Sequence, residues 1–225
     1  MPVHVRLTLL VGDPLRLGTA MQFLADETPL QVESEEGSLG MSLHENTELG
    51  VAVVESYWSS AEAMRATEAV VSLAAEAARR STGTLSVEQY EVALWTRRMR
   101  PHPGAGVRLT RLETDPARVD EAIEAYARLA LPWFTETDGF CMTQLLVDRG
   151  SGRWIGETLW RDANALAASR SAAAGIRVGT AGSSGSVVRA LEEYRLVFSS
   201  LRAEPADAPG GPRAPGGTPP APPPG

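Results

Sequence analysis

The second half of the chain repeats the first half. Aligned with itself at a shift of 102 residues, the sequence has 18 identical pairs among the 63 pairs that run from Val5 to Thr67. Chains of ordinary composition match by chance at about 6–8% of positions. We therefore interpret the 225-residue chain as two copies of one unit, residues 1–100 and 101–202, joined where Pro and Gly residues break regular structure.

Each copy predicts the same order of elements. A strand rich in branched residues comes first, and an Asp-Pro pair, Asp13-Pro14 or Asp115-Pro116, then begins a helix. Two strands, an Ala-rich helix and a last strand follow. We expect these strands at residues 39–45, 51–58 and 85–95 of the first copy and at 140–147, 153–160 and 187–198 of the second.

The ends of the Ala-rich helices are predicted from capping residues and glycines. Ser59 and Glu62 form a capping box for the first helix, and Asp162 caps the second. The helices are expected to run to about Arg80 and Gly175. The Gly-rich run at 179–185 precedes a strand, which favours a flexible loop or lid over a phosphate-binding loop.

The order βαββαβ predicts an α+β fold. In a ferredoxin-like unit of this kind, both helices cover one face of an antiparallel sheet and the other face stays apolar. Two such units in one chain can cover each other. We expect an intrachain pair of sheets that face each other, as in a dimeric α+β barrel, while further oligomerisation is left open.

Composition excludes several classes of function. All 21 basic residues are Arg, so lysine Schiff bases, PLP anchoring and a Walker A loop are absent. The formal charge of −7 and the pI near 5.1 argue against nucleic acid and anionic membrane surfaces as partners. One cysteine, Cys141, and no long apolar run predict a reduced, cytoplasmic protein. Residues 203–225, with nine Pro and five Gly, are expected to be a disordered tail.

The sequence around each central Trp resembles a known family. The run from Glu55 to Met64, repeated from Glu157 to Leu166, is similar to the strand, Trp and capped-helix signature of antibiotic biosynthesis monooxygenases in the dimeric α+β barrel superfamily. The resemblance implies oxidation of an aromatic, phenolic or quinol-like small molecule by dioxygen, without metal, flavin or haem. The family also contains members without known activity, and a non-catalytic binding or scaffolding barrel is the alternative.

Two departures from the family pattern bear on its chemistry. Quinone-forming members often have an Asn four residues before the strand Trp, where this chain has Val54 and Gly156. Haem-degrading members need a His on the second helix, whereas the histidines here are His4, His44 and His102. The resemblance therefore supports the family more firmly than any catalytic residue, and disfavours a haem enzyme.

Candidate site residues are chosen from the residue types that this chemistry needs. His44, which stands in a predicted strand opposite Leu146 of the other copy, and Tyr57 are candidates for proton transfer. Aromatic and thioether side chains are candidates for substrate binding: Trp58, Trp160, Trp133, Phe134 and Met142. The structural alternative is a buried or exposed histidine and core packing for the aromatic residues.

Strand alternation places the glutamate found in both copies on the face opposite the central Trp. Glu55 lies on the face opposite Trp58, and Glu157 on the face opposite Trp160. The two glutamates are expected to form ion pairs across the interface of the sheets, with Arg6 or Arg108 as partners. No pair of His, or of His with Cys, has the spacing of a metal site.

Overall fold

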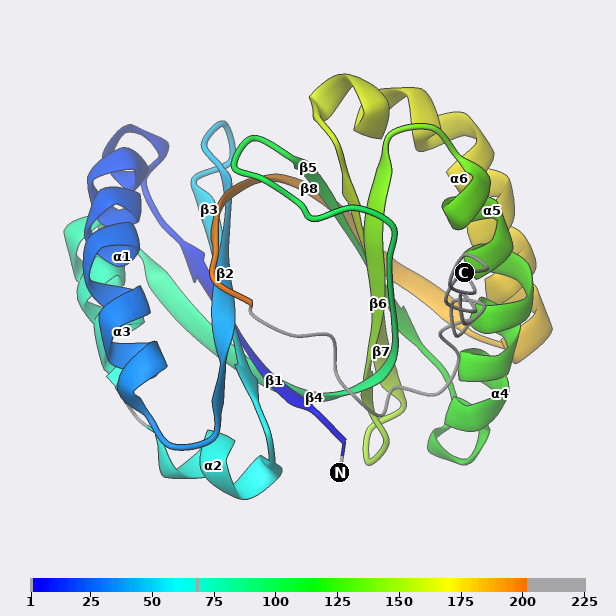
Figure 1. The fold of residues 1–225 in the computed structure, drawn as a ribbon, viewed down its shortest axis with the longest axis horizontal. Helices are drawn as coiled ribbons and strands as arrows, with labels where there is room; N and C mark the ends of the chain where they lie inside the picture. Colours follow the sequence, from blue (N-terminus) through cyan, green and yellow to red (C-terminus); the bar gives the residue numbers. More distant parts are fainter. Residues whose placement is uncertain (1, 68, 202–225) are drawn as a thin grey trace, which may run out of the picture.

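The computed structural model describes residues 2–67 and 69–201. The predicted disordered tail, residues 203–225, lies outside the described residues. Within them, each half has the order strand, helix, strand, strand, helix, strand, and the two halves form one closed barrel of eight strands (Figure 1). This arrangement confirms the predicted fold class of two βαββαβ units in one α+β barrel.

The first half begins with a strand and a helix that Asp13 caps, as predicted, by accepting a hydrogen bond from the Leu15 amide. A β-hairpin, two further helices and a long strand complete it. The elements are β1 (His4–Val11), α1 (Pro14–Ser34), β2 (Ser38–Asn46), β3 (Val51–Trp58), α2 (Ala61–Ala66), α3 (Ala69–Arg80) and β4 (Thr84–Arg97).

The second half follows the same path, with an interrupted first helix and an uninterrupted second one. Asp115 caps its helical segment as Asp13 caps the first. The elements are β5 (Gly106–Glu113), a 3₁₀ turn η1 (Pro116–Arg118), α4 (Val119–Ala125), a π-helical turn η2 (Tyr126–Ala130), α5 (Leu131–Glu136), β6 (Phe140–Asp148), β7 (Arg153–Trp160), α6 (Ala163–Ser184) and β8 (Val187–Ser199).

The two sheets meet at their edges as well as at their faces. The strand order around the barrel is β1-β3-β2-β8-β5-β7-β6-β4, and neighbouring strands are hydrogen-bonded. Two antiparallel seams, β2 with β8 and β4 with β6, therefore join one half to the other. The seams close the predicted pair of facing sheets into a barrel. Pairing at the seams satisfies the backbone groups of the edge strands, which would otherwise be exposed.

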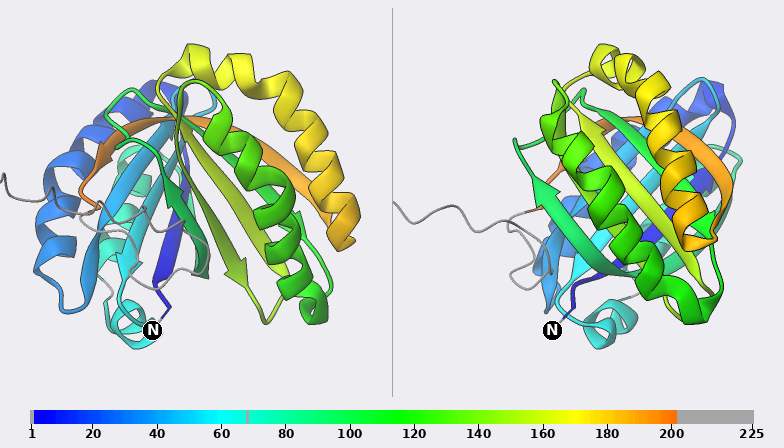
Figure 2. Two further views of the ribbon diagram at one scale, coloured as in Figure 1. Left: turned by 45° about the vertical axis from the view of Figure 1, so that its right-hand side comes forward. Right: turned by 90° about the vertical axis from the view of Figure 1, so that its right-hand side faces the viewer.

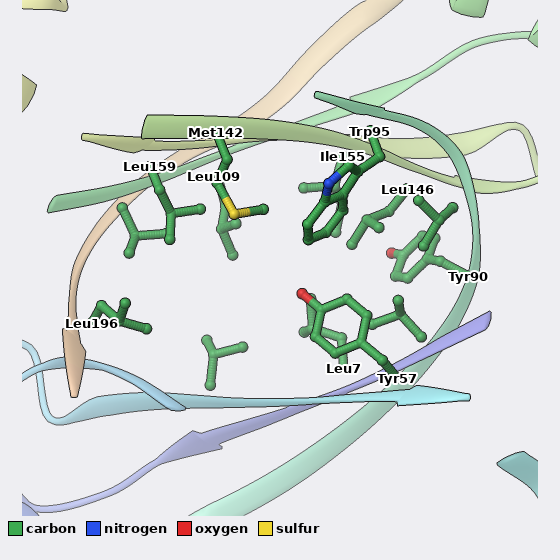
Figure 3. Close-up of a cluster of buried hydrophobic side chains, with 14 of the residues drawn as sticks. Leu7, Tyr57, Tyr90, Trp95, Leu109, Met142, Leu146, Ile155, Leu159 and Leu196 are labelled. Atoms are coloured by element: carbon green, nitrogen blue, oxygen red, sulfur yellow. The ribbon is translucent and has the colours of Figure 1, made fainter. Parts of the chain in front are cut away.

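Three apolar layers result, and Figures 1 and 2 show their arrangement. Helices α1 and α3 cover the outer face of the first half's strands, and α4, α5 and α6 cover that of the second half. Each helical layer buries one hydrophobic cluster against the sheet, and a third cluster fills the barrel interior. Figure 3 shows this interior, with side chains pointing inward from opposite walls. The two inner strands of each half's sheet, β1 and β3 or β5 and β7, thus have most of their side chains buried on both faces.

Two predicted boundaries are wrong for local reasons. Helix α6 continues to Ser184, so most of the Gly-rich run is helix, and Gly185 ends it in the left-handed conformation with φ 63°. The expected loop or lid is therefore absent at 179–185. The cap of α2 is Ser60, not Ser59, because the Ser60 hydroxyl accepts a hydrogen bond from the Ala63 amide. Among the described residues, no helix has the length and apolarity to cross a membrane.

Candidate functional site

Six polar side chains meet inside the barrel, where the rest of the lining is mainly apolar. They come from four strands, and all are buried: Ser42 and His44 of β2, Glu55 and Tyr57 of β3, Gln144 of β6 and Glu157 of β7. Alternation along each strand points these side chains inward together with the apolar residues of Figure 3. We call this set the interior polar cluster.

Hydrogen bonds connect most of the interior polar cluster. The hydroxyls of Ser42 and Tyr57 both donate to Oε2 of Glu55, at 2.9 and 2.7 Å. Gln144 Nε2 donates to the Tyr57 hydroxyl at 2.7 Å and also to Glu157 Oε2. Residues of both halves therefore share one buried network.

His44 lies between the two glutamates without bonding to either. Its Nε2 is 4.0 Å from Glu55 Oε2, and its Nδ1 is 3.9 Å from Glu157 Oε1. Neither ring nitrogen has a hydrogen-bond partner. Burial lowers the pKa of His44, and the nearby Glu55 only partly offsets this effect. The imidazole is therefore neutral around pH 7.

The same burial favours the protonated forms of Glu157 and Tyr57. Burial, and then repulsion from Glu55, raise the pKa of Glu157. Burial and the two glutamates raise the pKa of Tyr57 well above its ordinary value, so its hydroxyl remains protonated at neutral pH. Tyr57 is thus a hydrogen-bond donor in this cluster rather than a base.

A cavity of about 20 Å³ adjoins the interior polar cluster. Ser42, His44, Tyr57 and Glu157 line its inner part, and it extends to the exposed Arg100 near one end of the barrel. The volume holds a water molecule or an ion. It does not hold an aromatic ring, which requires a cavity nearer about 150 Å³.

The two central indoles lie on the other face of the sheet, as alternation predicts. Trp58 is fully buried in the cluster beneath α1 and α3, and Trp160 is fully buried beneath α4 to α6. Their N–H groups donate to Ser56 and Thr158, two residues earlier in the strands. Core side chains pack around both ring systems, and stacking of the indoles on a substrate stays a prediction.

The predicted glutamate–arginine pairs are also wrong. Arg6 and Arg108 point toward the helices, opposite to the inward-facing glutamates. Arg6 donates to the backbone carbonyls of Met64 and Thr67. Arg108 donates to Glu193, Ser169 and the Leu166 carbonyl.

A second cavity, of about 40 Å³, lies between the sheet and the helices of the second half. We call it the helix–sheet cavity. Its apolar wall contains three aromatic residues: Tyr126, Phe134 and Trp154. Its polar wall contains two arginines and three threonines: Arg108, Thr110, Thr158, Arg177 and Thr180. A cavity with mostly apolar walls and a few convergent polar groups is typical of a small-molecule site.

Two features of the helix–sheet cavity indicate room for an anionic group. Burial and the charge of Arg108 lower the pKa of Arg177, which means that the two guanidinium groups repel each other. The Thr180 hydroxyl is buried and has no hydrogen-bond partner. Because Arg108 already pairs with Glu193, a ligand oxygen carrying negative charge would serve Arg177 and the Thr180 hydroxyl.

The π-helical turn η2 shapes the apolar wall. Tyr126 and Ala130, at its two ends, both line the helix–sheet cavity, and π-turns of this kind recur at functional sites. The Tyr126 ring packs over Gly156, where a Cβ atom would lie 3.0 Å from Cε2 of that ring. Gly156 therefore makes space for Tyr126.

The structure distributes the predicted site residues over two places. His44, Tyr57 and Met142 line the small cavity beside the interior polar cluster. Phe134 lines the helix–sheet cavity, and Trp133 packs against it with ring centroids 5.1 Å apart while it also borders an outer groove. The proton-transfer candidates and the aromatic candidates thus lie on opposite faces of the sheet.

Several residues of both places escape prediction from the sequence. Ser42 and Gln144 are ordinary polar residues in strands, although they occupy equivalent positions of the repeat and both face the interior. Trp154 and Arg177 carry no motif. The hairpin of β6 and β7 offered a usable signal for Gln144. Its register pairs Gln144 with Glu157, so both side chains lie on the same face of the sheet.

The known proteins that match this chain cover 85–89% of it. No family model matches it. Two uncharacterized proteins of Mycobacterium tuberculosis H37Rv, Rv2557 and Rv2558, are each 29% identical to it, over 201 and 202 residues. These alignments cover 89% of this chain and 90% and 86% of those proteins. Their names assign no activity.

Solved structures share the fold. An anthrone oxidase-like protein matches 89% of this chain and 94% of its own with a TM-score of 0.65 and 18% identity. A ferredoxin-fold protein of Listeria monocytogenes 4b F2365, described as related to antibiotic biosynthesis monooxygenases, matches 85% and 93% of the two chains with a TM-score of 0.52 and 12% identity. The chain therefore has the ferredoxin-like barrel fold of proteins that resemble antibiotic biosynthesis monooxygenases.

Proposed function

We propose that this chain is a monooxygenase of the antibiotic biosynthesis type, which oxidises an aromatic phenolic or quinol-like small molecule with dioxygen. The observation that carries the proposal is the helix–sheet cavity, which combines aromatic walls with two arginines. The fold it shares with an anthrone oxidase-like protein supports the same reaction class. The electrons come from the substrate, so the reaction as proposed uses no metal, flavin or haem.

The aromatic wall would hold the ring of the substrate. Trp154 and Tyr126 pack edge to face, with centroids 6.3 Å apart, and Phe134 lies 6.0 Å from Tyr126. A planar ring that enters between them meets both faces and edges of aromatic side chains, which are favourable contacts. The ring would then point its oxygen substituent toward the polar wall.

The polar wall would hold the substrate as its anion. Arg108 and Arg177 attract a phenolate or enolate oxygen, and the Thr180 hydroxyl can donate to it. Opposite charges nearby lower the pKa of the bound phenol, which raises the fraction of the electron-rich anion. His44 and Tyr57 face the barrel interior, so the proposal gives them no contact with the ring.

The reaction is balanced by the substrate and dioxygen alone. For a phenol whose ring carries an activated CH₂ group, the anion transfers electrons to dioxygen and a carbon–oxygen bond forms at that carbon. Loss of the two hydrogens with the second oxygen atom gives a C=O group and one water molecule. The protein's part is to enclose the anion and stabilise its charge.

Binding requires the helix–sheet cavity to expand. Its volume of about 40 Å³ is below the roughly 150 Å³ that encloses a benzene ring. Helix α6, which supplies Ala173, Ile176, Arg177 and Thr180 to the wall, is the mobile side on this proposal. An outward shift of α6 is not opposed on its exposed face, where Gly175 has open space around it.

A non-catalytic ligand-binding protein is the second candidate. It is favoured by one observation: the residues that line the helix–sheet cavity include no His, Asp or Glu to act as a base. Such a protein would bind the same anionic aromatic compounds and leave them unchanged. Measurement of binding and of oxygen consumption in one sample separates the two candidates.

The experiment uses the full chain treated with a chelator, mixed with an anthrone or a hydroquinone. We expect quenching of Trp154 fluorescence and oxygen uptake above the rate in buffer. Arg177→Met and Thr180→Val should reduce both signals, whereas Arg128→Met, an exposed arginine on η2, should not. Quenching without oxygen uptake would support the binding protein. Neither signal, over a panel of such compounds, would contradict both functions.

A further inference from the structure

We propose that the interior polar cluster binds one divalent transition-metal ion, with His44, Glu55 and Glu157 as its ligands. The site is separate from the helix–sheet cavity and lies on the other face of the sheet. It draws His44 and Glu55 from the first half and Glu157 from the second. The bound ion would link the two halves at the centre of the barrel.

The ligand atoms are already close to the required geometry. One ring nitrogen of His44 and one carboxylate oxygen from each glutamate lie within 4.8 Å of one another. Ligand atoms that share a zinc ion at bonds near 2.1 Å are roughly 3.4 Å apart. The three groups therefore need to approach by about 1 Å, which small rotations of their side chains supply.

Polar atoms without hydrogen bonds point to a missing ligand. In the part of the chain that the structure describes, both nitrogens of His44 and the Oε1 atoms of Glu55, Gln144 and Glu157 are buried without a hydrogen-bond partner, apart from the bond that a protonated Glu157 makes with Glu55. Buried polar atoms are nearly always hydrogen-bonded, and each exception costs free energy of folding. All five atoms belong to groups that donate electron pairs to metals, so one ion would explain most of them together.

The adjoining cavity has the size of an ion. Its volume of about 20 Å³ is bordered by His44 and Glu157, and by the hydroxyl-bearing Ser42 and Tyr57. This space accepts an ion or a water molecule and excludes an organic ligand. Because the cavity reaches the exposed Arg100, an ion can arrive from that end of the barrel.

Charge compensation also favours a cation. Among the described residues, no salt bridge joins Glu55 or Glu157 to an arginine. Elsewhere in the interior, Arg111 bonds both Glu88 and Glu192, at 2.6 and 2.7 Å, which shows how the barrel neutralises other carboxylates. Two adjacent buried carboxyl groups without such a partner are costly to ionise together, and a divalent ion would offset that cost.

The donor set selects the class of metal. One imidazole with two carboxylates is a mixed nitrogen and oxygen site, which suits Zn²⁺, Fe²⁺ or Mn²⁺. Calcium and magnesium prefer oxygen ligands alone, and no thiolate lies in the set to favour Cu⁺. The sequence gives no sign of this site, because its ligands come from three strands and follow no short motif.

The test measures metal binding by the chelator-stripped full chain, with Zn²⁺ for stoichiometry and Co²⁺ for its absorption spectrum. We expect one ion per chain and a melting temperature that rises with the concentration of Zn²⁺. Glu157→Gln keeps the size of the side chain and should weaken binding by at least about 10-fold. It should not lower the melting temperature in chelator, since it removes one of two adjacent carboxylates.

Two further variants keep the test decisive. His44→Leu removes one ligand and leaves both carboxylates, so it replaces Glu157→Gln if that variant does not fold. His4→Ala is the matched control, because His4 lies in a surface groove with Glu91 and Asp148. Full binding by Glu157→Gln and His44→Leu would overturn the proposal, as would absence of binding by the unaltered chain.

Discussion

In each half of the molecule, helices cover the outer face of a four-stranded sheet. The two halves share this fold, but different side chains fill the space between helices and sheet. In the first half, Val54 fills the cluster under α1 and α3. At the equivalent position of the second half, Gly156 leaves room that Tyr126 occupies, and the helix–sheet cavity lies beside it. At this position, a smaller side chain on the outer face of the strand accompanies a larger side chain from the helix.

The inner faces of the halves differ too. Glu55 and Glu157 are equivalent, inward-facing and buried, whereas the other positions of the cluster differ: Ser42 corresponds to Gln144, His44 to Leu146 and Tyr57 to Leu159. The barrel interior thus keeps its acidic pair and places the imidazole on one side only. The two halves, which share one order of elements, thus differ at both faces of their sheets.

Gly156→Val tests the comparison most severely, because it introduces the first half's residue into the second layer. A Cβ atom added at position 156 would lie 3.0 Å from the Tyr126 ring. The two further methyl groups of valine would displace that ring. Overpacking of this kind costs about 3 kcal/mol of unfolding free energy, measurable by urea titration. The double variant with Tyr126→Leu should recover part of the loss. A purely additive loss would show that the ring and position 156 do not compete for space.

Glu193→Gln replaces the carboxylate that pairs with Arg108 by the amide that the first half has beside Arg6. Arg108 pairs in register with Glu193, while Arg6 pairs with Gln89. The Arg108 guanidinium is buried and lies 2.9 Å from Glu193 Oε1, so loss of the carboxylate should cost about 2 kcal/mol, less than for a fully buried pair. Urea titration checks this value, and an unchanged free energy would mean that Ser169 and the Leu166 carbonyl suffice for Arg108.

The same ion pair predicts a pH dependence. Burial opposes ionisation of Glu193, but hydrogen bonds from Arg170 and Arg108 outweigh it and hold the pKa of this carboxyl below its ordinary value. Its contribution to stability is therefore complete above the pKa of the unfolded chain and is lost as the pH falls through the folded pKa. The difference between the unaltered chain and Glu193→Gln should shrink on acidification. A difference that grows would contradict the assignment.

His44→Leu exchanges the imidazole for the residue that the second half has at Leu146. In chelator, this change removes two buried nitrogens that lack hydrogen bonds, and should raise the unfolding free energy by about 1 kcal/mol. The reciprocal Leu146→His should lower it. Calorimetry on the metal-free proteins provides the comparison, and destabilisation by His44→Leu would show that the ring makes contacts the apolar side chain cannot replace.

Gly175→Ala should have the smallest effect. It tests whether helix propensity contributes to the continuity of α6, the helix that the first half divides in two. Helix α6 is continuous, whereas the first half divides the same stretch into α2 and α3. Gly175 is exposed within α6 and has no neighbouring atom that an added Cβ would meet. The variant should gain about 0.5 kcal/mol from helix propensity, seen as a higher melting temperature. No gain would indicate that α6 is frayed at this point.

Local signals in the sequence predicted most of the fold. Asp13 and Asp115 cap the helices they were expected to cap, and the strands at 51–58 and 153–160 have the predicted bounds. The helix propensity of glycine, taken without tertiary packing, predicts a loop for the Gly-rich run at 179–185. In α6 it is helical, where Thr180 and Ala181 are buried.

The sites were less predictable, because they depend on which face of the sheet meets which partner. Alternation placed Glu55 and Trp58 on opposite faces correctly, yet could not tell that helices would enclose the indole completely. The approach of His44 to Glu157 joins strands of different halves and leaves no spacing to recognise. Hydrogen bonding of β2 with β8 and β4 with β6 brings such residues together, and neither seam has a sequence motif.

The seams have a consequence for how the molecule tolerates cutting. Each seam joins strands from different halves through their backbones, so the peptide between β4 and β5 is not what holds the halves together. Fragments produced by cleavage in that connection should reassociate into a noncovalent complex. Either fragment alone would expose two unpaired edges, and would be expected to combine with a second copy of itself.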